Sequence, residues 1–253
     1  MKLIVIIGPT AVGKTKLSIK IAKEIGGEII GADSRQVYRY MDIGTAKPLP
    51  HEREVPYHLI DVIYPDEEFS LAIFKKLFYE KLGEIKGRGK IPFLVGGTGQ
   101  YIWAVLEGWK IPPVPPNKEL RRELEEKAKR EGVESIFREL LKLDPEAEKI
   151  IDPRNLRRII RAIEVSKALG IPFTKARTKE KPGFKPLIIG LKADRPSLYR
   201  RIEERVDRMM EMGFLEEVEG LLRMGYSPEL PSMNTFGYRE LSLYICLLYT
   251  SDA

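Results

Sequence analysis

The residues of this chain best suited to chemistry lie near its amino terminus. The string GPTAVGKT follows the apolar run Leu3 to Ile7. Two glycines separated by four residues, with Lys-Thr after the second, let backbone N–H groups surround phosphate oxygens at the start of a helix. The Lys14 ammonium would reach the outer phosphates, and the Thr15 hydroxyl would bind Mg²⁺. The spacing predicts a phosphate-binding P-loop for a nucleotide such as ATP or for a diphosphate, made of Gly8, Pro9, Thr10, Ala11, Val12, Gly13, Lys14 and Thr15.

A carboxylate is expected beside this loop. Residues Glu28 to Ala32 form a short apolar run that predicts a buried strand ending at Asp33. Because the carboxyl ends of parallel strands meet at one edge of a sheet, Asp33 is a candidate general base. A helix cap or an indirect Mg²⁺ partner is the alternative role for it. The residues that follow, Ser34, Arg35 and Gln36, offer a mixed hydrogen-bonding surface.

A second glycine turn, Gly96-Gly97-Thr98-Gly99, follows the predicted strand Ile91 to Val95. Glycines there allow the backbone to come close to a ligand, and Thr98 presents one hydroxyl. Such turns also occur for purely conformational reasons, so the pattern alone is weak. Its expected place at the same sheet edge makes it a candidate part of the site.

Arginines cluster at helical spacing in two later segments. No acidic residue occurs from Arg154 to Ala162, so the first cluster predicts an unneutralised stripe that could contact a phosphate backbone. A solvated helix face is the alternative. In the second segment, Arg201 and Arg205 are four residues apart and could reach back to the P-loop. The members of the first cluster are Arg154, Arg157, Arg158 and Arg161.

The elements that must position these residues alternate between strand and helix, which predicts an α/β fold with a parallel sheet. The strand candidates are Leu3 to Ile7, Glu28 to Ala32, His58 to Ile63, Ile91 to Val95 and Leu187 to Leu191. A proline-rich linker at 112–116 precedes a charged segment without strand-like runs, with helices expected near 118–131, 134–143 and 156–169. The prediction is a core of residues 1–115 and 186–253 with an inserted helical subdomain and return loop at 116–185.

Composition limits the functional classes. The net charge is +6, which favours polyanionic partners weakly. A single cysteine, Cys246, excludes an intrachain disulfide, and two histidines exclude a Cys/His zinc cluster. No apolar segment approaches the ~20 residues needed to span a bilayer. We therefore expect a cytoplasmic monomer with no membrane partner.

Six strings occur in one order along residues 1–240, and together they resemble the bacterial tRNA dimethylallyltransferases, also called tRNA isopentenyltransferases. The strings are GPTAVGKT, GADSRQVYRYMDIGTAKP, HLIDVIYPDEEFS, GGTGQYI, RRIIRAIEV and GYRE. The resemblance implies a P-loop kinase-like core with a helical insertion. It also implies that the P-loop binds the diphosphate of dimethylallyl diphosphate rather than supporting ATP hydrolysis.

The resemblance further implies a reaction. Asp33 would accept a proton from the N6 amine of the adenine 3′ of the anticodon in tRNA, as that nitrogen attacks the first allylic carbon. Lys14, Thr15 with Mg²⁺, and Thr98 would neutralise the leaving diphosphate, aided by Arg205 or by Arg201. The adenine would be flipped into a cleft between core and insertion. Its contacts would come from Asp33, Ser34, Arg35, Gln36 and Thr98, and the RNA backbone would be held by Arg157, Arg158 and Arg161.

The chain departs from the family pattern after GYRE. The family continues with a basic helix, whereas this chain reads LSLYICLLYT. The departure predicts a truncated or frame-shifted segment after about residue 240, an altered last core helix and weakened tRNA binding.

Three other functions compete with this one. An adenylate isopentenyltransferase resembles the same core but acts on a free nucleotide and needs no basic insertion. A small-metabolite P-loop kinase would place ATP on Gly8 to Thr15 and use Asp33 as its base. A non-catalytic RNA-binding module would tolerate loss of Asp33.

Overall fold

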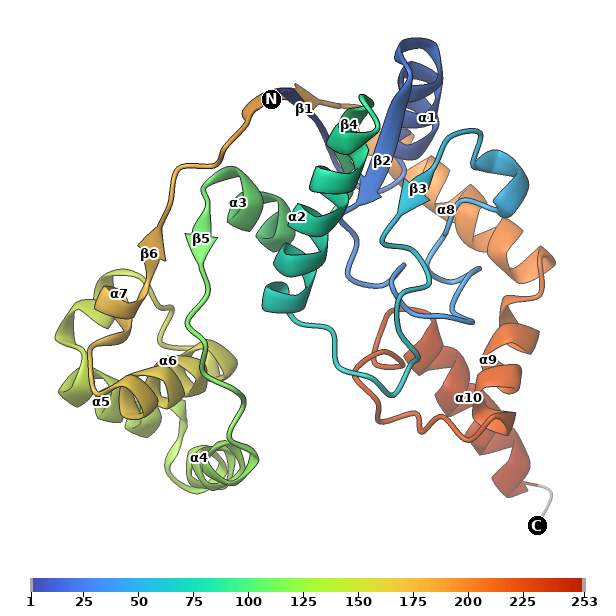
Figure 1. Ribbon diagram of the computed structural model, residues 1–253. Coiled ribbons are helices and arrows are strands. Elements are labelled where there is room, and N and C mark those ends of the chain that lie inside the picture. Colours follow the sequence, from blue (N-terminus) through green and yellow to red (C-terminus); the bar gives the residue numbers. More distant parts are fainter. Residues whose placement is uncertain (1, 252–253) are drawn as a thin grey trace. The chain divides into compact units, whose positions relative to one another are not determined.

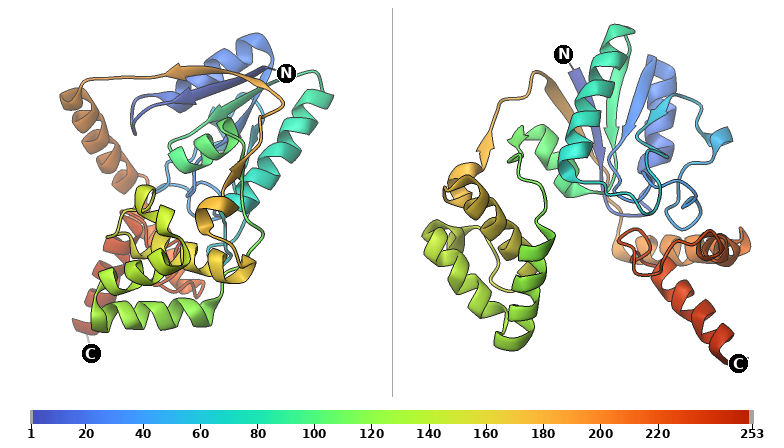
Figure 2. Two further views of the ribbon diagram at one scale, coloured as in Figure 1. Left: turned by 90° about the vertical axis from the view of Figure 1, so that its left-hand side faces the viewer. Right: turned by 60° about the horizontal axis from the view of Figure 1, so that its bottom comes forward.

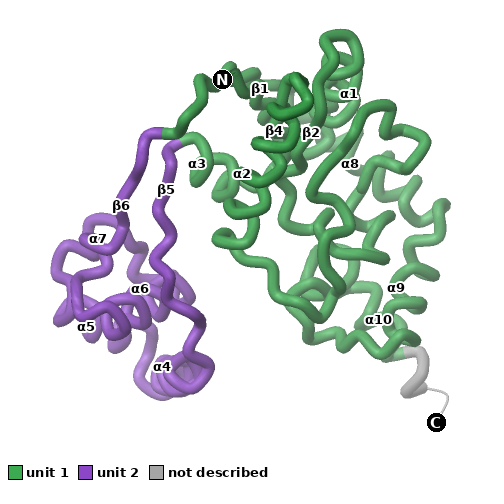
Figure 3. The backbone as a smooth tube through the Cα atoms, viewed as in Figure 1, with its two compact units in different colours: residues 1–106, 182–253 green, residues 107–181 purple. Residues whose placement is uncertain are grey.

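A computed structural model describes residues 2–251 of the chain, with side-chain surroundings for residues 2–247. These residues form two compact units, shown in two colours in Figure 3. Unit 1 contains the residues up to Leu106 and those from Pro182 onward, and unit 2 is Glu107–Lys181. The insertion expected at 116–185 overlaps unit 2 over most of its length.

Unit 1 is built on a five-stranded parallel sheet with the strand order β3-β2-β4-β1-β7 (Figure 1). This confirms the predicted α/β class. The third strand is much shorter than expected, because Leu59 and Asp61 have left-handed backbone angles, φ 62° and 54°, that end the extended conformation. The strands are β1 (Lys2–Ile7), β2 (Gly27–Gly31), β3 (Tyr57–His58), β4 (Ile91–Val95) and β7 (Lys185–Gly190).

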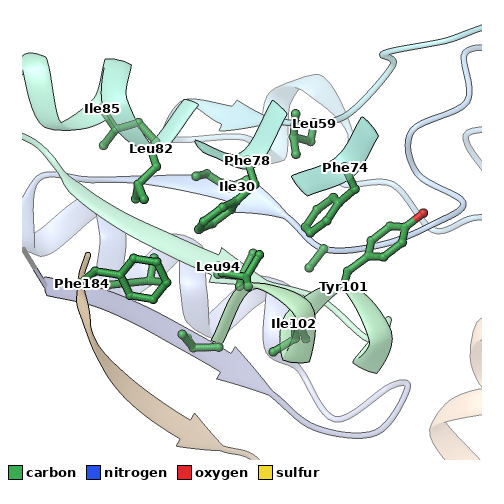
Figure 4. Close-up of a cluster of buried hydrophobic side chains, with 14 residues drawn as sticks. Ile30, Leu59, Phe74, Phe78, Leu82, Ile85, Leu94, Tyr101, Ile102 and Phe184 are labelled. Carbon is green, nitrogen blue, oxygen red and sulfur yellow. The ribbon is translucent and has the colours of Figure 1, made fainter. Parts of the chain in front are cut away.

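Helices cover both faces of this sheet (Figure 2). Alternate residues of a strand point to opposite faces, so β1 sends Leu3 and Val5 to one side and Ile6 to the other. The first side packs against α2 (Leu71–Gly87) and α3 (Gly99–Leu106), and Figure 4 shows Phe74 and Phe78 of α2 over it. The second side packs against α1 (Lys14–Ile25).

Three further helices complete unit 1: α8 (Arg195–Glu211), α9 (Phe214–Arg223) and α10 (Tyr238–Ser251), with a short 3₁₀ helix at Pro50–Glu52. Helices α9 and α10 pack together over the loop that follows β2, through Phe214, Tyr238 and Met41. Ile245 belongs to the same buried cluster. The atypical stretch after GYRE is therefore helical, and its start packs against α9.

Unit 2 is mainly helical. The helices expected from the sequence are confirmed as α4 (Lys118–Glu131), α5 (Val133–Leu143) and α6 (Leu156–Leu169). They are joined by a 3₁₀ helix at Pro145–Lys149 and followed by the single-turn α7 (Phe173–Ala176). Two short antiparallel strands that the sequence did not predict, β5 (Trp109–Lys110) and β6 (Thr178–Lys179), pair where the chain enters and leaves the unit.

A buried carboxylate organises unit 2. Glu164 of α6 is only 2% exposed and binds three groups at once. One oxygen accepts the Asn117 N–H at 2.6 Å and Arg121 Nε at 3.0 Å, and the other accepts Arg121 Nη2 at 2.9 Å and the Arg161 guanidinium. Burial alone would raise the pKa of Glu164, but these hydrogen bonds hold it below its usual value. Glu164 thereby joins α6 to the start of α4.

We expect Glu164→Gln to lower the free energy of unfolding by about 2–3 kcal/mol, because it removes a buried carboxylate that binds two half-buried guanidinium groups. Glu126→Gln, exposed on α4, is the matched control and should change it by no more than about 0.5 kcal/mol. Urea denaturation followed by circular dichroism measures both. Equal effects of the two substitutions would show that the Glu164 cluster does not stabilise the unit.

Candidate functional site

The predicted P-loop joins β1 to α1. Gly13 immediately precedes α1 with φ 98°, and Ala11 has φ 61°, so the loop curls back over the helix start. Gly8 is required by packing, since a Cβ there would lie 2.8 Å from the Leu191 carbonyl oxygen. The backbone thus has the shape that exposes N–H groups at a helix N-terminus, where anions bind.

Lys14 lies across this loop. Its Nζ donates to the carbonyl oxygens of Gly8 at 2.9 Å and Pro9 at 2.8 Å. Burial lowers the pKa of Lys14, Asp33 opposes that shift and Arg205 adds to it. The ammonium therefore lies within electrostatic reach of both predicted partners.

Asp33 follows the carboxyl end of β2, as predicted. Its Oδ1 accepts the backbone N–H groups of Arg35 at 2.8 Å and Gln36 at 3.3 Å, which is an Asx turn and not the cap of a helix. Among the described residues, none donates a hydrogen bond to Oδ2. The turn fixes the carboxylate and leaves one oxygen to act on a ligand.

The second glycine turn packs directly on this segment. The Thr98 N–H donates to the Ala32 carbonyl at 3.1 Å, and Thr98 Oγ1 accepts the Ser34 N–H at 3.0 Å. Gly96 is required there, because a Cβ would lie 2.1 Å from the Ala32 carbonyl oxygen. The Thr98 oxygen thus positions the loop that carries Asp33.

A cavity of about 1040 Å³ brings these groups together. It is lined by Lys14 and Thr15 of the P-loop, by Asp33 and Gln36, and by the α8 arginines. Arg201, Arg205 and Arg208 recur at intervals of four and three, so they share one face of α8. Burial lowers the pKa of Arg205, and Asp33 opposes that shift. Of the two arginines considered from the sequence, Arg205 is the more buried one.

Several predicted residues do not line this cavity. Arg35 lies beside it, but its Nη1 donates to the Pro231 carbonyl at 2.8 Å. Ser34 and Thr98 do not line the cavity, and the Ser34 N–H donates to Thr98 Oγ1. The remaining predicted P-loop residues, Gly8, Pro9 and Val12, shape the loop without lining the cavity.

The arginine stripe belongs to unit 2, and the expectation that it is wholly unneutralised is wrong. Arg161 binds Glu164 and donates to the Val114 carbonyl at 2.9 Å, and Arg154 pairs with Asp152 at 3.1 Å. Glu164 and Asp152 both lie just outside the acid-free segment, so the sequence window missed them. Arg157 and Arg158 are exposed and form no ion pair with any described residue.

The sequence did not predict one segment of the cavity lining. It is the loop 42–47 that follows the Asp33 turn, and Gln36 Nε2 donates to its carbonyls at Thr45 (3.2 Å) and Ala46 (3.0 Å). Lys47 of this loop is only 6% exposed. Its Nζ donates to Asp42 Oδ1 at the start of the loop and to Asp61 Oδ1 outside it, at 2.6 Å each. The sequence signal was the long string GADSRQVYRYMDIGTAKP, which marks the segment without showing what it contacts.

Two sequence models of known families match this chain. A sequence model described as IPP transferase matches residues 36–252, and one described as isopentenyl transferase matches residues 1–57. The chain is 52% identical to a tRNA dimethylallyltransferase of Roseiflexus castenholzii over 243 residues, 96% of this chain and 79% of that protein. The chain belongs to the tRNA dimethylallyltransferase family. A family member of Chloroflexus aurantiacus is 49% identical over 96% of this chain and 82% of its own length.

Solved structures of this family have the same fold. The tRNA isopentenylpyrophosphate transferase of Bacillus halodurans matches with a TM-score of 0.69 and 42% identity over 98% of this chain and 78% of its own. A eukaryotic dimethylallyltransferase acting on tRNA matches with a TM-score of 0.81 and 29% identity, covering 97% of this chain and 63% of its own. Within residues 2–251, no helix has the length and apolar character of a membrane span.

The contact between Gly96 and Ala32 gives a test of the site's construction. We expect Gly96→Ala to lower the free energy of unfolding by about 2–3 kcal/mol, because the added methyl group overlaps backbone that cannot move aside. Gly99→Ala is the matched control, since a Cβ there meets no atom within 4 Å. Chemical denaturation of both variants measures the difference. Equal stability of the two would contradict this close approach.

Proposed function

We propose that the protein transfers the dimethylallyl group of dimethylallyl diphosphate to the N6 amine of the adenine 3′ of the anticodon in tRNA, releasing diphosphate. The observation that supports this most is the cavity of unit 1, where a carboxylate with an open oxygen faces the same space as a P-loop. A carboxylate can accept a proton, and a P-loop can hold a diphosphate leaving group. Relatives named tRNA dimethylallyltransferase support tRNA as the acceptor and a dimethylallyl compound as the donor.

The leaving group explains the cations of the cavity. As the C–O bond of the donor breaks, negative charge grows on the diphosphate, and groups already aimed at it lower the barrier. Lys14, Arg205 and the N–H groups at the start of α1 are such groups. Arg201 and Arg208 extend the positive lining along α8.

Asp33 is assigned to the acceptor. The adenine N6 forms a bond to the first allylic carbon while the bond from that carbon to oxygen breaks, and the amine then carries a surplus proton. Asp33 Oδ2 takes that proton, while Oδ1 is held by the Asx turn. Gln36, beside it in the cavity wall, has its NH₂ fixed by carbonyls and its Oε1 left for the base.

Mg²⁺ fits this donor set. It binds hard oxygen ligands and often takes most of them from substrate phosphates and water. The Thr15 hydroxyl lines the cavity next to Lys14 and would hold the ion. Bound there, Mg²⁺ would supply positive charge to the departing diphosphate.

The exposed arginines of unit 2 suit the RNA part of the substrate. We assign Arg157 and Arg158 to the phosphate backbone, because phosphate contacts position an RNA without reading its sequence. The RNA role of Arg161 stays a prediction, and its bonds to Glu164 and Val114 favour structural support. We also propose that the protein acts in the cytoplasm, because its substrate is tRNA and its single cysteine can form no intrachain disulfide. We expect it to be a monomer.

The activity is tested by incubating the protein with unmodified tRNA, Mg²⁺ and dimethylallyl diphosphate and then analysing the nucleosides by mass spectrometry. We expect a five-carbon unit on one adenosine. Free AMP as acceptor and ATP with a small alcohol are run in parallel. Prenylation of AMP alone would favour the adenylate enzyme, and phosphoryl transfer alone would favour the kinase.

Asp33→Asn should lower the transfer rate by roughly 10²- to 10⁴-fold, since the amide keeps the shape of the side chain but cannot accept the proton. Affinity for tRNA, measured by filter binding, should change less than about threefold. Asp66→Asn, exposed and outside the cavity, is the control and should have the wild-type rate. A wild-type rate in Asp33→Asn would remove Asp33 from the mechanism.

Arg157→Ala and Arg158→Ala should each weaken tRNA binding and reduce the slope of log K against log salt by about one, because each removes one phosphate contact. Arg161→Ala, the comparison variant, should leave the slope unchanged and instead lower the midpoint of urea denaturation. Salt titrations of tRNA affinity measure the slopes. A reduced slope in Arg161→Ala alone would reverse the two assignments.

A further inference from the structure

A carboxylate outside the cavity holds the backbone of one cavity wall. Glu217 of α9 binds the loop 42–47 through three successive N–H groups. Its Oε2 accepts those of Asp42 at 2.9 Å and Ile43 at 2.8 Å, and its Oε1 accepts that of Gly44 at 3.3 Å. Consecutive N–H groups that converge in this way form a binding site for an anion, here occupied by a side chain of the same unit.

Tyr238, in the GYRE string, completes this arrangement. Its hydroxyl donates to Glu217 Oε1 at 2.5 Å, and its ring is fully buried, edge-on to Phe214 at 4.9 Å. Burial, together with the neighbouring Glu217 carboxylate, raises the pKa of Tyr238, so the hydroxyl keeps its proton and stays a donor. Gly44 lies against both rings, since a Cβ there would come within 2.3 Å of Phe214 and 2.5 Å of Tyr238. The loop is therefore held by hydrogen bonds and by packing.

The held loop reaches the site through Gln36. The Gln36 NH₂ group donates to the carbonyls of Thr45 and Ala46, at 3.2 and 3.0 Å, so both of its protons are used within the loop. The Gln36 backbone N–H also donates to Asp33 Oδ1. A shift of the loop would therefore move the Gln36 amide, which lines the cavity next to Asp33.

We infer that Glu217 and Tyr238 are positioning residues for prenyl transfer, which fix the loop 42–47 and through it the Gln36 amide that faces the acceptor base. The inference rests on the proposed function. It assigns a role to Tyr238 of the GYRE string and to Glu217 of α9. Neither residue belongs to the P-loop or to the Asp33 turn. Neither residue lines the cavity, so their effect is indirect.

Two variants separate this role from loss of folding. Glu217→Gln keeps the size of the side chain but turns an NH₂ group toward N–H or O–H donors, which removes part of the hold on the loop. Tyr238→Phe keeps the buried ring and removes only the hydroxyl. Glu216→Gln is the matched control, because Glu216 precedes Glu217 on α9, is exposed, and undergoes the same change in charge.

The first measurement is amide hydrogen exchange of residues 42–44 in the full chain, which requires no substrate. We expect faster exchange there in Glu217→Gln and Tyr238→Phe and wild-type exchange in Glu216→Gln. The second is steady-state kinetics with tRNA and dimethylallyl diphosphate varied separately. We expect kcat/KM for tRNA to fall about 10- to 100-fold in Glu217→Gln, with KM for the prenyl donor within about twofold of wild type.

Unchanged exchange at 42–44 in both variants would overturn the inference, since Glu217 would then not hold the loop. Faster exchange with unchanged kinetics would also overturn it, since the loop position would not matter for transfer. An equal loss of kcat/KM in Glu216→Gln would point to charge and not to position. If the wild-type protein transfers no prenyl group, the proposed function fails, and the exchange data still decide whether Glu217 holds the loop.

Discussion

The site depends on how closely the ends of β2 and β4 approach each other. Because Gly96 has no side chain, the Thr98 N–H can bond to the Ala32 carbonyl, and Thr98 Oγ1 can then accept the Ser34 N–H. β4 pairs on its other edge with β1, whose end carries the P-loop. These contacts, together with the pairing of β4 and β1, set the carboxylate of one strand beside the phosphate loop of another, as the proposed proton acceptor and leaving-group site require.

Two cations of this cavity lie where desolvation disfavours their charged form. Burial lowers the pKa of both Lys14 and Arg205, so the protein keeps two cations where desolvation disfavours them. Asp33 offsets part of that cost for both groups. Over the whole lining, eight Lys and Arg side chains face four carboxylates, so positive charge remains in excess. A diphosphate would supply the missing negative charge. The excess of positive charge, which is unfavourable in the free protein, favours binding of a diphosphate donor and stabilises the diphosphate as it leaves.

Sequence patterns predicted those features that depend on neighbouring residues. The P-loop, the strand ends and the three long helices of unit 2 follow from glycine spacing and apolar period, which are local. The partner of Arg161 did not follow, although Glu164 is only three residues away, because a helix turn had to bring both beside Asn117 and Arg121. Contacts such as those of Glu217, 175 residues from Asp42, are set by packing and leave no local pattern.

The carboxylates that hold the fold and the carboxylate assigned to the reaction differ in how many of their oxygens accept hydrogen bonds. Both oxygens of Glu164, of Glu217 and of Glu28, which binds Arg88 and His58, accept hydrogen bonds. Protonating any of them would break a bond that holds the fold, so these groups are poor bases for a reaction. Asp33 is held through Oδ1, and no described residue donates a hydrogen bond to its second oxygen. Because one oxygen of Asp33 is open and both oxygens of Glu217 accept hydrogen bonds, we assign proton transfer to Asp33 and positioning of the loop to Glu217.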